Sequence, residues 1–254
     1  MSSSFQGPFK STGPEVLNFV ITGPPKCGTS ALQTALATHP RVVCHAELLA
    51  ESNAVRRSHH EEYFGPSGNT PDWLVTGHIS GEQYLTNKIF DNPLSGESFI
   101  GVTVLYPHIH AYDLWDYLTC WCQGGDFCLV QVKRNPVACF IALENERRMA
   151  SGLAYRLDIN ELISFVRMQL ATDAKVARLC GDRLEINYSE LVNSHAQVVS
   201  GVFDFIGVPP GGRGKPGAPA GSYRDFERVP AHWQYLREKV PSDVQQYFDP
   251  EEFI

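Results

Sequence analysis

The stretch VLNFVITGPPKCGTSALQTALAT, residues 16–38, decides the fold of this chain. Residues 16–21 are mostly apolar and partly β-branched, which predicts a buried strand. A loop rich in glycine and proline follows, and residues 30–38 have the pattern of a helix that ends before His39 and Pro40. A loop that joins a strand to a helix places backbone N–H groups at the positive end of the helix dipole. We therefore expect an anion to bind at residues 23–30.

The rest of the chain alternates between strand and helix patterns. Strands are predicted at residues 41–44, 99–105, 127–132 and 184–188, and helices at 136–149, 159–179, 191–206 and around 232–239. This alternation predicts the α/β class, with a mostly parallel central sheet flanked by helices. We expect a flexible N-terminus at residues 1–14 and a single domain over 15–254. A polar insertion at 52–98 is of a kind that often covers a substrate site.

Composition excludes several classes of function. The chain has 254 residues and a formal net charge of −7, and it shows no basic stripe of the kind that binds nucleic acid. No apolar run approaches the ~20 residues that span a bilayer, and residues 1–14 lack the pattern of a signal peptide. The seven cysteines are odd in number, and neither disulfide nor metal-ligand spacing appears. We expect a cytosolic protein that uses no metal, no nucleic acid and no membrane.

The order of residues in the loop argues against ATP. The common nucleotide loop is GxxxxGK[ST], whose lysine follows the second glycine. Here the string is GPPKCGTS, so Thr29 follows Gly28 and the lysine, Lys26, stands two residues before it. An enzyme for ATP or GTP is therefore the second hypothesis.

The loop resembles the signature PKxGTxxL of the sulfotransferases, which use 3′-phosphoadenosine 5′-phosphosulfate (PAPS). The resemblance runs from about residue 16 to 209 and implies the P-loop-like sulfotransferase fold. It also implies that the loop binds the 5′-phosphosulfate of PAPS and that Lys26 contacts the oxygen between phosphate and sulfate. The implied contacts with PAPS, or with its product PAP, are Pro25, Lys26, Cys27, Gly28, Thr29, Ser30 and Ala31.

A second anchor is implied for the 3′-phosphate. Arg134 follows the strand at 127–132 and resembles the arginine of the family pattern RxPxxxxxS, where its planar fork would bond phosphate. The serine of that pattern is replaced by Ala142. Tyr188 resembles a later contact of the family, and Arg213 and Lys215 are candidates for its C-terminal loop.

Sulfuryl transfer needs a base for the acceptor and a cation beside the leaving oxygen. Lys26 suits the second task. The string HPRVVCHAE, residues 39–47, resembles the family branch that uses glutamate, so Glu47 is the favoured base. His45 and His108 are rival candidates.

The leading hypothesis is transfer of the sulfuryl group from PAPS to a hydroxyl or amine of a small molecule, with secondary metabolism as the expected setting. A sulfotransferase-like protein that binds PAP without turnover is a further alternative, because Ala142 breaks the family pattern. Six aromatic residues are equally well interpreted as an acceptor pocket or as core. They are Trp73, Tyr84, Phe90, Tyr106, Tyr112 and Trp115. The acceptor and the oligomeric state stay open.

Overall fold

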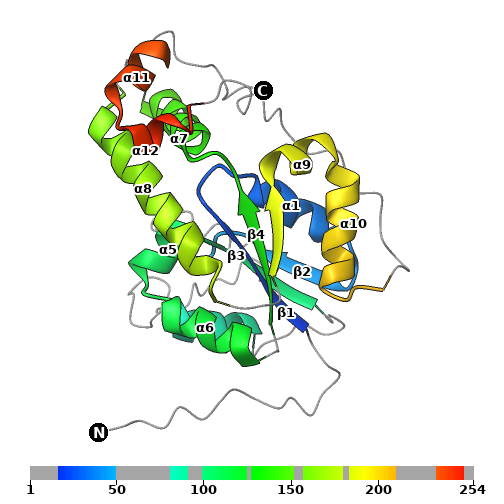
Figure 1. The fold of residues 1–254 in the computed structure, drawn as a ribbon. Helices are drawn as coiled ribbons and strands as arrows, with labels where there is room; N and C mark the ends of the chain where they lie inside the picture. Colours follow the sequence, from blue (N-terminus) through cyan, green and yellow to red (C-terminus); the bar gives the residue numbers. More distant parts are fainter. Residues whose placement is uncertain are drawn as a thin grey trace, which may run out of the picture.

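The computed structural model describes residues 17–49, 81–90, 99–124, 127–151, 157–179, 183–209 and 233–248. Within these ranges, five parallel strands form one sheet in the order β2-β3-β1-β4-β5 (Figure 1). The predicted α/β class with a parallel sheet is therefore confirmed. The strands are β1 (Leu17–Gly23), β2 (Val42–His45), β3 (Phe99–Leu105), β4 (Phe127–Lys133) and β5 (Arg183–Asn187).

Helices cover both faces of the sheet. Figure 1 shows α1 and α10 on one face, and α5, α6 and α8 on the other. The first helices are α1 (Thr29–Leu36), α4 (Gly81–Tyr84), the π-helical turn η1 (Leu85–Phe90), α5 (Tyr106–Ala111), α6 (Trp115–Gly124) and α7 (Pro136–Ser151). The later ones are α8 (Ile159–Val176), α9 (Tyr188–Asn193), α10 (His195–Phe205), α11 (Trp233–Lys239) and α12 (Ser242–Gln245). No helix in the described ranges is long and apolar enough to cross a membrane.

The side chains of β1 show how the sheet divides the core. Phe19 and Ile21 pack into a cluster with α1 and α10, whereas Val20 between them joins a cluster with α5 and α6. Successive side chains of a strand point to opposite faces, so a strand covered on both sides is apolar throughout. This is why residues 16–21 are apolar at every position except Asn18.

A third apolar cluster attaches the C-terminal segment to α7 and α8. Val244 and Phe248 are buried there against Val137 and Phe140 of α7. The ion pair between Arg167 Nε of α8 and Asp243 Oδ2, 3.0 Å long, lies at the surface of the same contact. Residues 242–248 therefore pack on the helix that follows β4.

Some local predictions differ from the structure. The helix predicted over 191–206 is two helices, α9 and α10, which are separated at Ser194 by an extended φ of −131°. Helices α5 and α6 were not predicted. Within the predicted insertion, residues 81–90 contribute Tyr84, Leu85 and Ile89 to the core, and the rest of 52–98 lies outside the described residues. The predicted N-terminus at 1–14 is also outside them.

Candidate anion-binding site

Three of the predicted site segments lie at one edge of the sheet. The loop at 23–28 follows β1, Arg134 follows β4, and Tyr188 begins α9 directly after β5. The strands β1, β4 and β5 are neighbours and parallel, so their carboxyl ends meet at the same edge. Ligands of open α/β sheets bind in the crevice outside these strand ends.

The loop leaves the start of α1 open. Gly28 is the N-cap residue, with φ 94° and ψ 8°, and it has no side chain that could cap the helix. The buried sulfur of Cys27 accepts from the N–H and the hydroxyl of Thr29, so no side-chain oxygen or charge occupies this end. The first turn of α1 contains no acidic residue. Because the first backbone N–H groups of a helix have no partner within the helix, this end carries partial positive charge. An anion is the natural ligand for it.

Gly28 is required by both conformation and space. Its positive φ is one that side-chain-bearing residues rarely adopt, and a Cβ added here would lie 2.9 Å from Leu191 Cδ2 and 3.3 Å from Tyr188 Cδ2. Both of these neighbours belong to α9. The loop therefore packs closely on the helix that follows β5, which fixes the position of its backbone.

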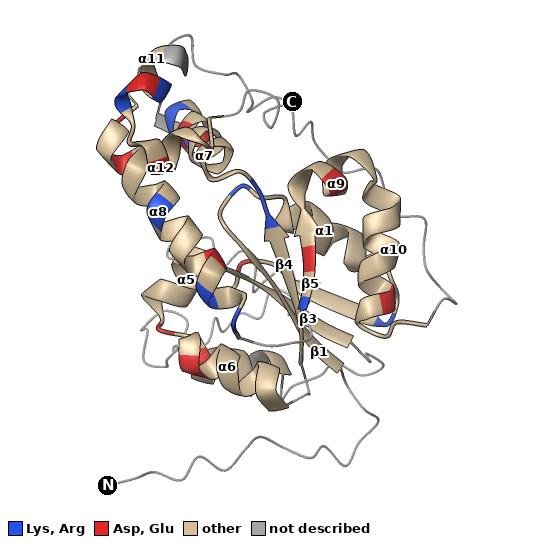
Figure 2. Cartoon of the chain, in the orientation of Figure 1, with Lys and Arg blue, Asp and Glu red and all other residues tan. Residues whose placement is uncertain are grey.

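Lys26 and Arg134 meet directly. Arg134 Nη1 donates a hydrogen bond to the carbonyl oxygen of Lys26, at 2.7 Å, across 108 residues of sequence. The guanidinium of Arg134 also lies over the ring of Tyr188, 4.0 Å from its centroid. Figure 2 shows the basic end of β4 beside the loop that leaves β1. The structure thus brings together three residues that were predicted separately.

The ammonium of Lys26 has a partner that was not predicted. Lys26 Nζ lies 2.6 Å from Glu146 Oε1 of α7, and both side chains are partly exposed. Lys26 itself has a φ of 65°, in the left-handed region. Its carbonyl and its ammonium are therefore held by two different parts of the segment that begins with Arg134.

Buried side chains support the site from below. Gln169 of α8 is 1% exposed and donates to the carbonyl oxygen of Arg134, at 3.0 Å. Cys27 and Cys139 are completely buried; burial raises the pKa of Cys27 and raises that of Cys139 to about 12. Thiols with raised pKa are poor nucleophiles, so we assign both cysteines to packing.

Asn135 closes the start of α7. Its Oδ1 accepts from the N–H groups of Val137, at 2.9 Å, and Ala138, at 3.2 Å, and its Nδ2 donates to the Tyr247 carbonyl oxygen, at 2.9 Å. The pair Asn135-Pro136 carries a sequence signal for this role, since Asn is favoured at N-caps and Pro at the first helical position. Ala142, further along α7, is 2% exposed and offers no hydroxyl.

The candidate bases lie at the ends of β2 and β3. His45 is 3% exposed and pairs in register with Val102, so β2 stops three residues before the end of β3. Glu47 follows β2 and is half-buried. His108 is 5% exposed, and its Nδ1 accepts the N–H of Leu105, at 3.3 Å, where it helps to cap α5.

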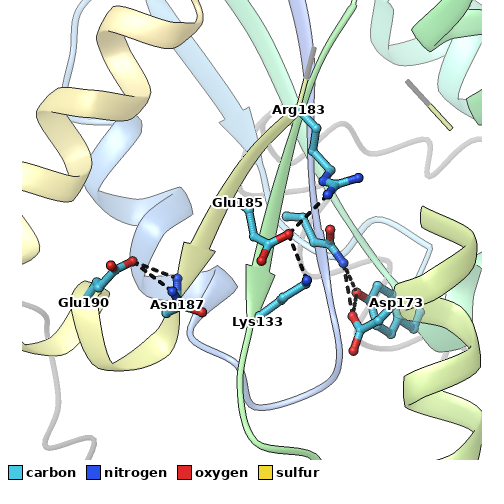
Figure 3. A network of polar contacts seen from close by, with 8 residues as sticks. Lys133, Asp173, Arg183, Glu185, Asn187 and Glu190 are labelled. Atoms are coloured by element: carbon cyan, nitrogen blue, oxygen red, sulfur yellow. Dashed lines mark hydrogen bonds and ion pairs between the residues drawn. The ribbon is translucent and has the colours of Figure 1, made fainter. Parts of the chain in front are cut away.

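A polar network lies between β4, β5 and α8 (Figure 3). Glu185 Oε2 accepts from Lys133 Nζ, at 2.8 Å, and Arg183 Nη2, at 3.2 Å, and the bond to Lys133 keeps the pKa of Glu185 low. Asp173 accepts from Tyr106 Oη and from Gln131 Nε2, and burial nevertheless raises its pKa. No sequence pattern pointed to Asp173, which lies in the last turn of the long helix α8.

The aromatic candidates for an acceptor pocket are core residues where they are described. Tyr84, Phe90, Tyr106 and Trp115 belong to one buried cluster, and Tyr112 packs against it. Trp73, Arg213 and Lys215 lie outside the described residues. Among the residues described here, no group of His, Cys, Asp or Glu is placed to hold a metal ion.

Two solved structures resemble this arrangement over most of the chain. A sulfotransferase from Alicyclobacillus acidocaldarius superposes with a TM-score of 0.56 at 20% identity, covering 93% of both chains. The chain has the sulfotransferase fold. The sulfotransferase domain from the curacin biosynthetic pathway shares this fold with a TM-score of 0.50 at 16% identity, covering 93% of this chain and 97% of that one. No protein-family model and no curated protein matches the sequence.

Proposed function

We propose that this protein is a sulfotransferase that moves the sulfuryl group of PAPS to a hydroxyl or amine of a small molecule. One observation carries the proposal: Arg134 donates to the carbonyl oxygen of Lys26 and stacks on Tyr188. The residues expected to hold the two phosphate-bearing ends of the donor are thereby neighbours at one edge of the sheet. The sulfotransferase fold supports the same conclusion.

The loop has the features that a phosphosulfate needs. Gly28 caps the start of α1 with no side chain, and it lets the loop pack against Leu191 and Tyr188 of α9, which positions the backbone N–H groups. In the proposal, the N–H groups from Cys27 to Ser30 and the hydroxyls of Thr29 and Ser30 hold the 5′ end, with Pro25 shaping the turn. The N–H of Ala31 donates to the carbonyl oxygen of Gly28, at 3.1 Å, and would contact the ligand only by sharing that bond. When bound, PAPS supplies the sulfuryl group and a phosphate as leaving group. The ammonium of Lys26 would then stabilise the negative charge on the leaving oxygen.

Arg134 and Tyr188 would hold the 3′-phosphate. The guanidinium has donors beyond the one that binds Lys26, and its planar fork suits a phosphate. Arg213 and Lys215 remain proposed contacts at this end.

Glu47 is the proposed proton acceptor. It follows β2 at the carboxyl edge of the sheet and is half-buried, whereas His45 and His108 are almost fully buried. His108 also uses Nδ1 to cap α5. Glu47 would take the proton of the acceptor as its oxygen or nitrogen attacks sulfur. His45 is the second choice.

The absence of a hydroxyl at Ala142 favours a second candidate function, PAP binding without turnover. Ala142 is buried in α7, so it contributes no bond to the 3′-phosphate. PAP binding without transfer to any acceptor would support this alternative. Magnesium-dependent binding of ATP in preference to PAP would support the third hypothesis, an enzyme for ATP or GTP.

The first test measures transfer of label from radiolabelled PAPS to pools of small alcohols, phenols and amines, alongside PAP binding by calorimetry. We expect Lys26→Ala to lower turnover at least about 100-fold, as loss of a donor to the developing charge does. Arg134→Ala should weaken PAP binding by roughly 10- to 100-fold, since hydrogen bonds to charged groups are strong.

The matched control is Lys133→Ala, which removes the adjacent cation. Lys133 pairs with Glu185 and has no assigned contact with the donor, so PAP binding should change less than about threefold. A wild-type protein that neither binds PAP nor transfers label would refute the proposed function. Equal losses in the Lys133 and Arg134 variants would remove Arg134 from the donor site.

A further inference from the structure

The pair between Lys26 and Glu146 joins the anion loop to α7. The two residues are 120 positions apart, and Lys26 Nζ lies 2.6 Å from Glu146 Oε1. Glu144, two residues earlier in α7, instead pairs with Arg147 at 2.5 Å. Two acidic residues of one helix therefore have different partners, and only one of these partners belongs to the loop.

The carboxylate of Glu146 pairs with the ammonium of Lys26, which is the side chain of the loop that a bound anion would contact. The loop combines the open start of α1 with Lys26, and both attract negative charge. Glu146 forms an ion pair with Lys26 and so offsets its charge. A phosphate or phosphosulfate that contacts Lys26 must therefore replace the carboxylate and then lie near it.

A ligand can replace Glu146 beside Lys26 without moving the backbone of the loop. The side chains of Lys26 and Glu146 are 35% and 48% exposed, and ion pairs at that exposure are weak. The backbone of Lys26 is held separately, because its carbonyl accepts from Arg134 Nη1. Opening the ion pair consequently moves two side chains and leaves the loop in place.

We propose that Glu146 is an exchangeable counter-ion of Lys26 that sets the affinity of the loop for its ligands. The inference rests on the proposed function, in which the 5′ end of the donor contacts Lys26. Every ligand that contacts Lys26 must displace Glu146, and this lowers the affinity of each such ligand by the same factor. A ligand that reaches only Arg134 and Tyr188 is unaffected.

Three nucleotides separate these cases in calorimetry at low salt. PAP has both phosphates, adenosine 5′-monophosphate has only the 5′ group, and adenosine 3′-monophosphate has only the 3′ group. In Glu146→Gln, the first two should bind roughly three- to fivefold more tightly than to wild type, whereas the third should be unchanged. The control Glu144→Gln removes the same charge from the same helix and should change none of the three.

A double-mutant cycle tests whether the effect passes through Lys26. In a Lys26→Met background, Glu146→Gln should lose most of its gain for PAP. An undiminished gain there, a gain with adenosine 3′-monophosphate, a gain as large in Glu144→Gln, or weaker PAP binding in Glu146→Gln would overturn the inference. If wild type and all variants fail to bind PAP, the proposed function fails instead, and the two failures are distinguishable.

Discussion

The crossovers that leave β1 and β4 start from neighbouring parallel strands, yet their helices begin in opposite ways. After β4, Asn135 accepts from two N–H groups of α7 and closes its N-terminus. After β1, α1 begins at Gly28 with no side-chain cap. The segment after β4 also holds the loop after β1 in place, because Arg134 donates to the carbonyl oxygen of Lys26. In the proposed function, the start of α1 receives the anion, whereas the start of α7 is capped and only Arg134 before it reaches the ligand.

Other helices of the fold strengthen this contrast. Asp158 caps α8 by accepting from Asn160 N–H at 2.8 Å, and α9 begins with a capping box between Asn187 and Glu190. Helix α10 also lacks a side-chain cap, but it follows α9 after the single residue Ser194. Helix α1 differs from α10 in that its open end adjoins two basic side chains at the carboxyl edge of the sheet.

The largest effect is expected from placing an acid at the open end. Ser30 is exposed in the first turn of α1, so Ser30→Asp should fold and should stabilise the helix by about 0.3–1 kcal/mol through the dipole. The same carboxylate would repel a bound phosphate, and PAP binding should weaken at least about tenfold. Calorimetry with PAP and urea denaturation measure the two effects.

The isosteric variant Ser30→Asn isolates the charge. It loses the same hydroxyl but adds no negative charge. Most of the loss of PAP affinity expected for Ser30→Asp should therefore be absent in Ser30→Asn. Equal affinities in the two variants would mean that the start of α1 does not receive the anion, and the comparison of the two crossovers would lose its functional meaning.

A smaller effect is expected from opening the closed end. Asn135→Ala removes the cap of α7 and the bond to the Tyr247 carbonyl, which should lower the free energy of unfolding by about 1–2 kcal/mol. PAP affinity should change much less than in Ser30→Asp. Asn135→Asp keeps the capping oxygen and loses only the donor to Tyr247, so it should recover most of the stability. If it is as unstable as Asn135→Ala, the contact with Tyr247 is the important one.

The elements that follow from local pattern were predicted well. The strand at Phe99–Leu105 was predicted to the residue, and β1 and α1 to within two residues at each end. The division between α9 and α10 was missed, although Asn187 and Glu190 have the spacing of a capping box. Helix α5 was missed because its start depends on His108, whose bond to Leu105 is visible only in the folded chain.

The meeting of Lys26 and Arg134 was predictable for a topological reason. Both follow parallel strands, and residues in that position share one edge of a sheet. Glu146 and Gln169 were not predictable, because each lies within a long helix whose rotation and distance from the sheet depend on packing. The sequence therefore indicated the groups proposed to bind the ligand but not the side chains that hold them.

The smallest effect concerns the network beneath the end of β4. Burial raises the pKa of Asp173 above its ordinary value of about 3.9. The folded protein then binds this proton more tightly than the unfolded chain, so this group lowers stability as pH rises through that window, and the cost persists above it. Asp173→Asn keeps an oxygen for Tyr106 and Gln131 without the charge.

We expect the stability of Asp173→Asn relative to wild type to rise with pH, by less than about 1 kcal/mol, when urea denaturation is followed from pH 4 to pH 8. Glu185 provides a control of opposite sign. Lys133 lowers the pKa of Glu185, so Glu185→Gln should lose stability relative to wild type over the same range as pH rises. A relative stability of Asp173→Asn that falls with pH would mean that Asp173 is held as a favourable charge. The charge of Asp173, which Lys133 attracts, would then stabilise the network beneath the end of β4.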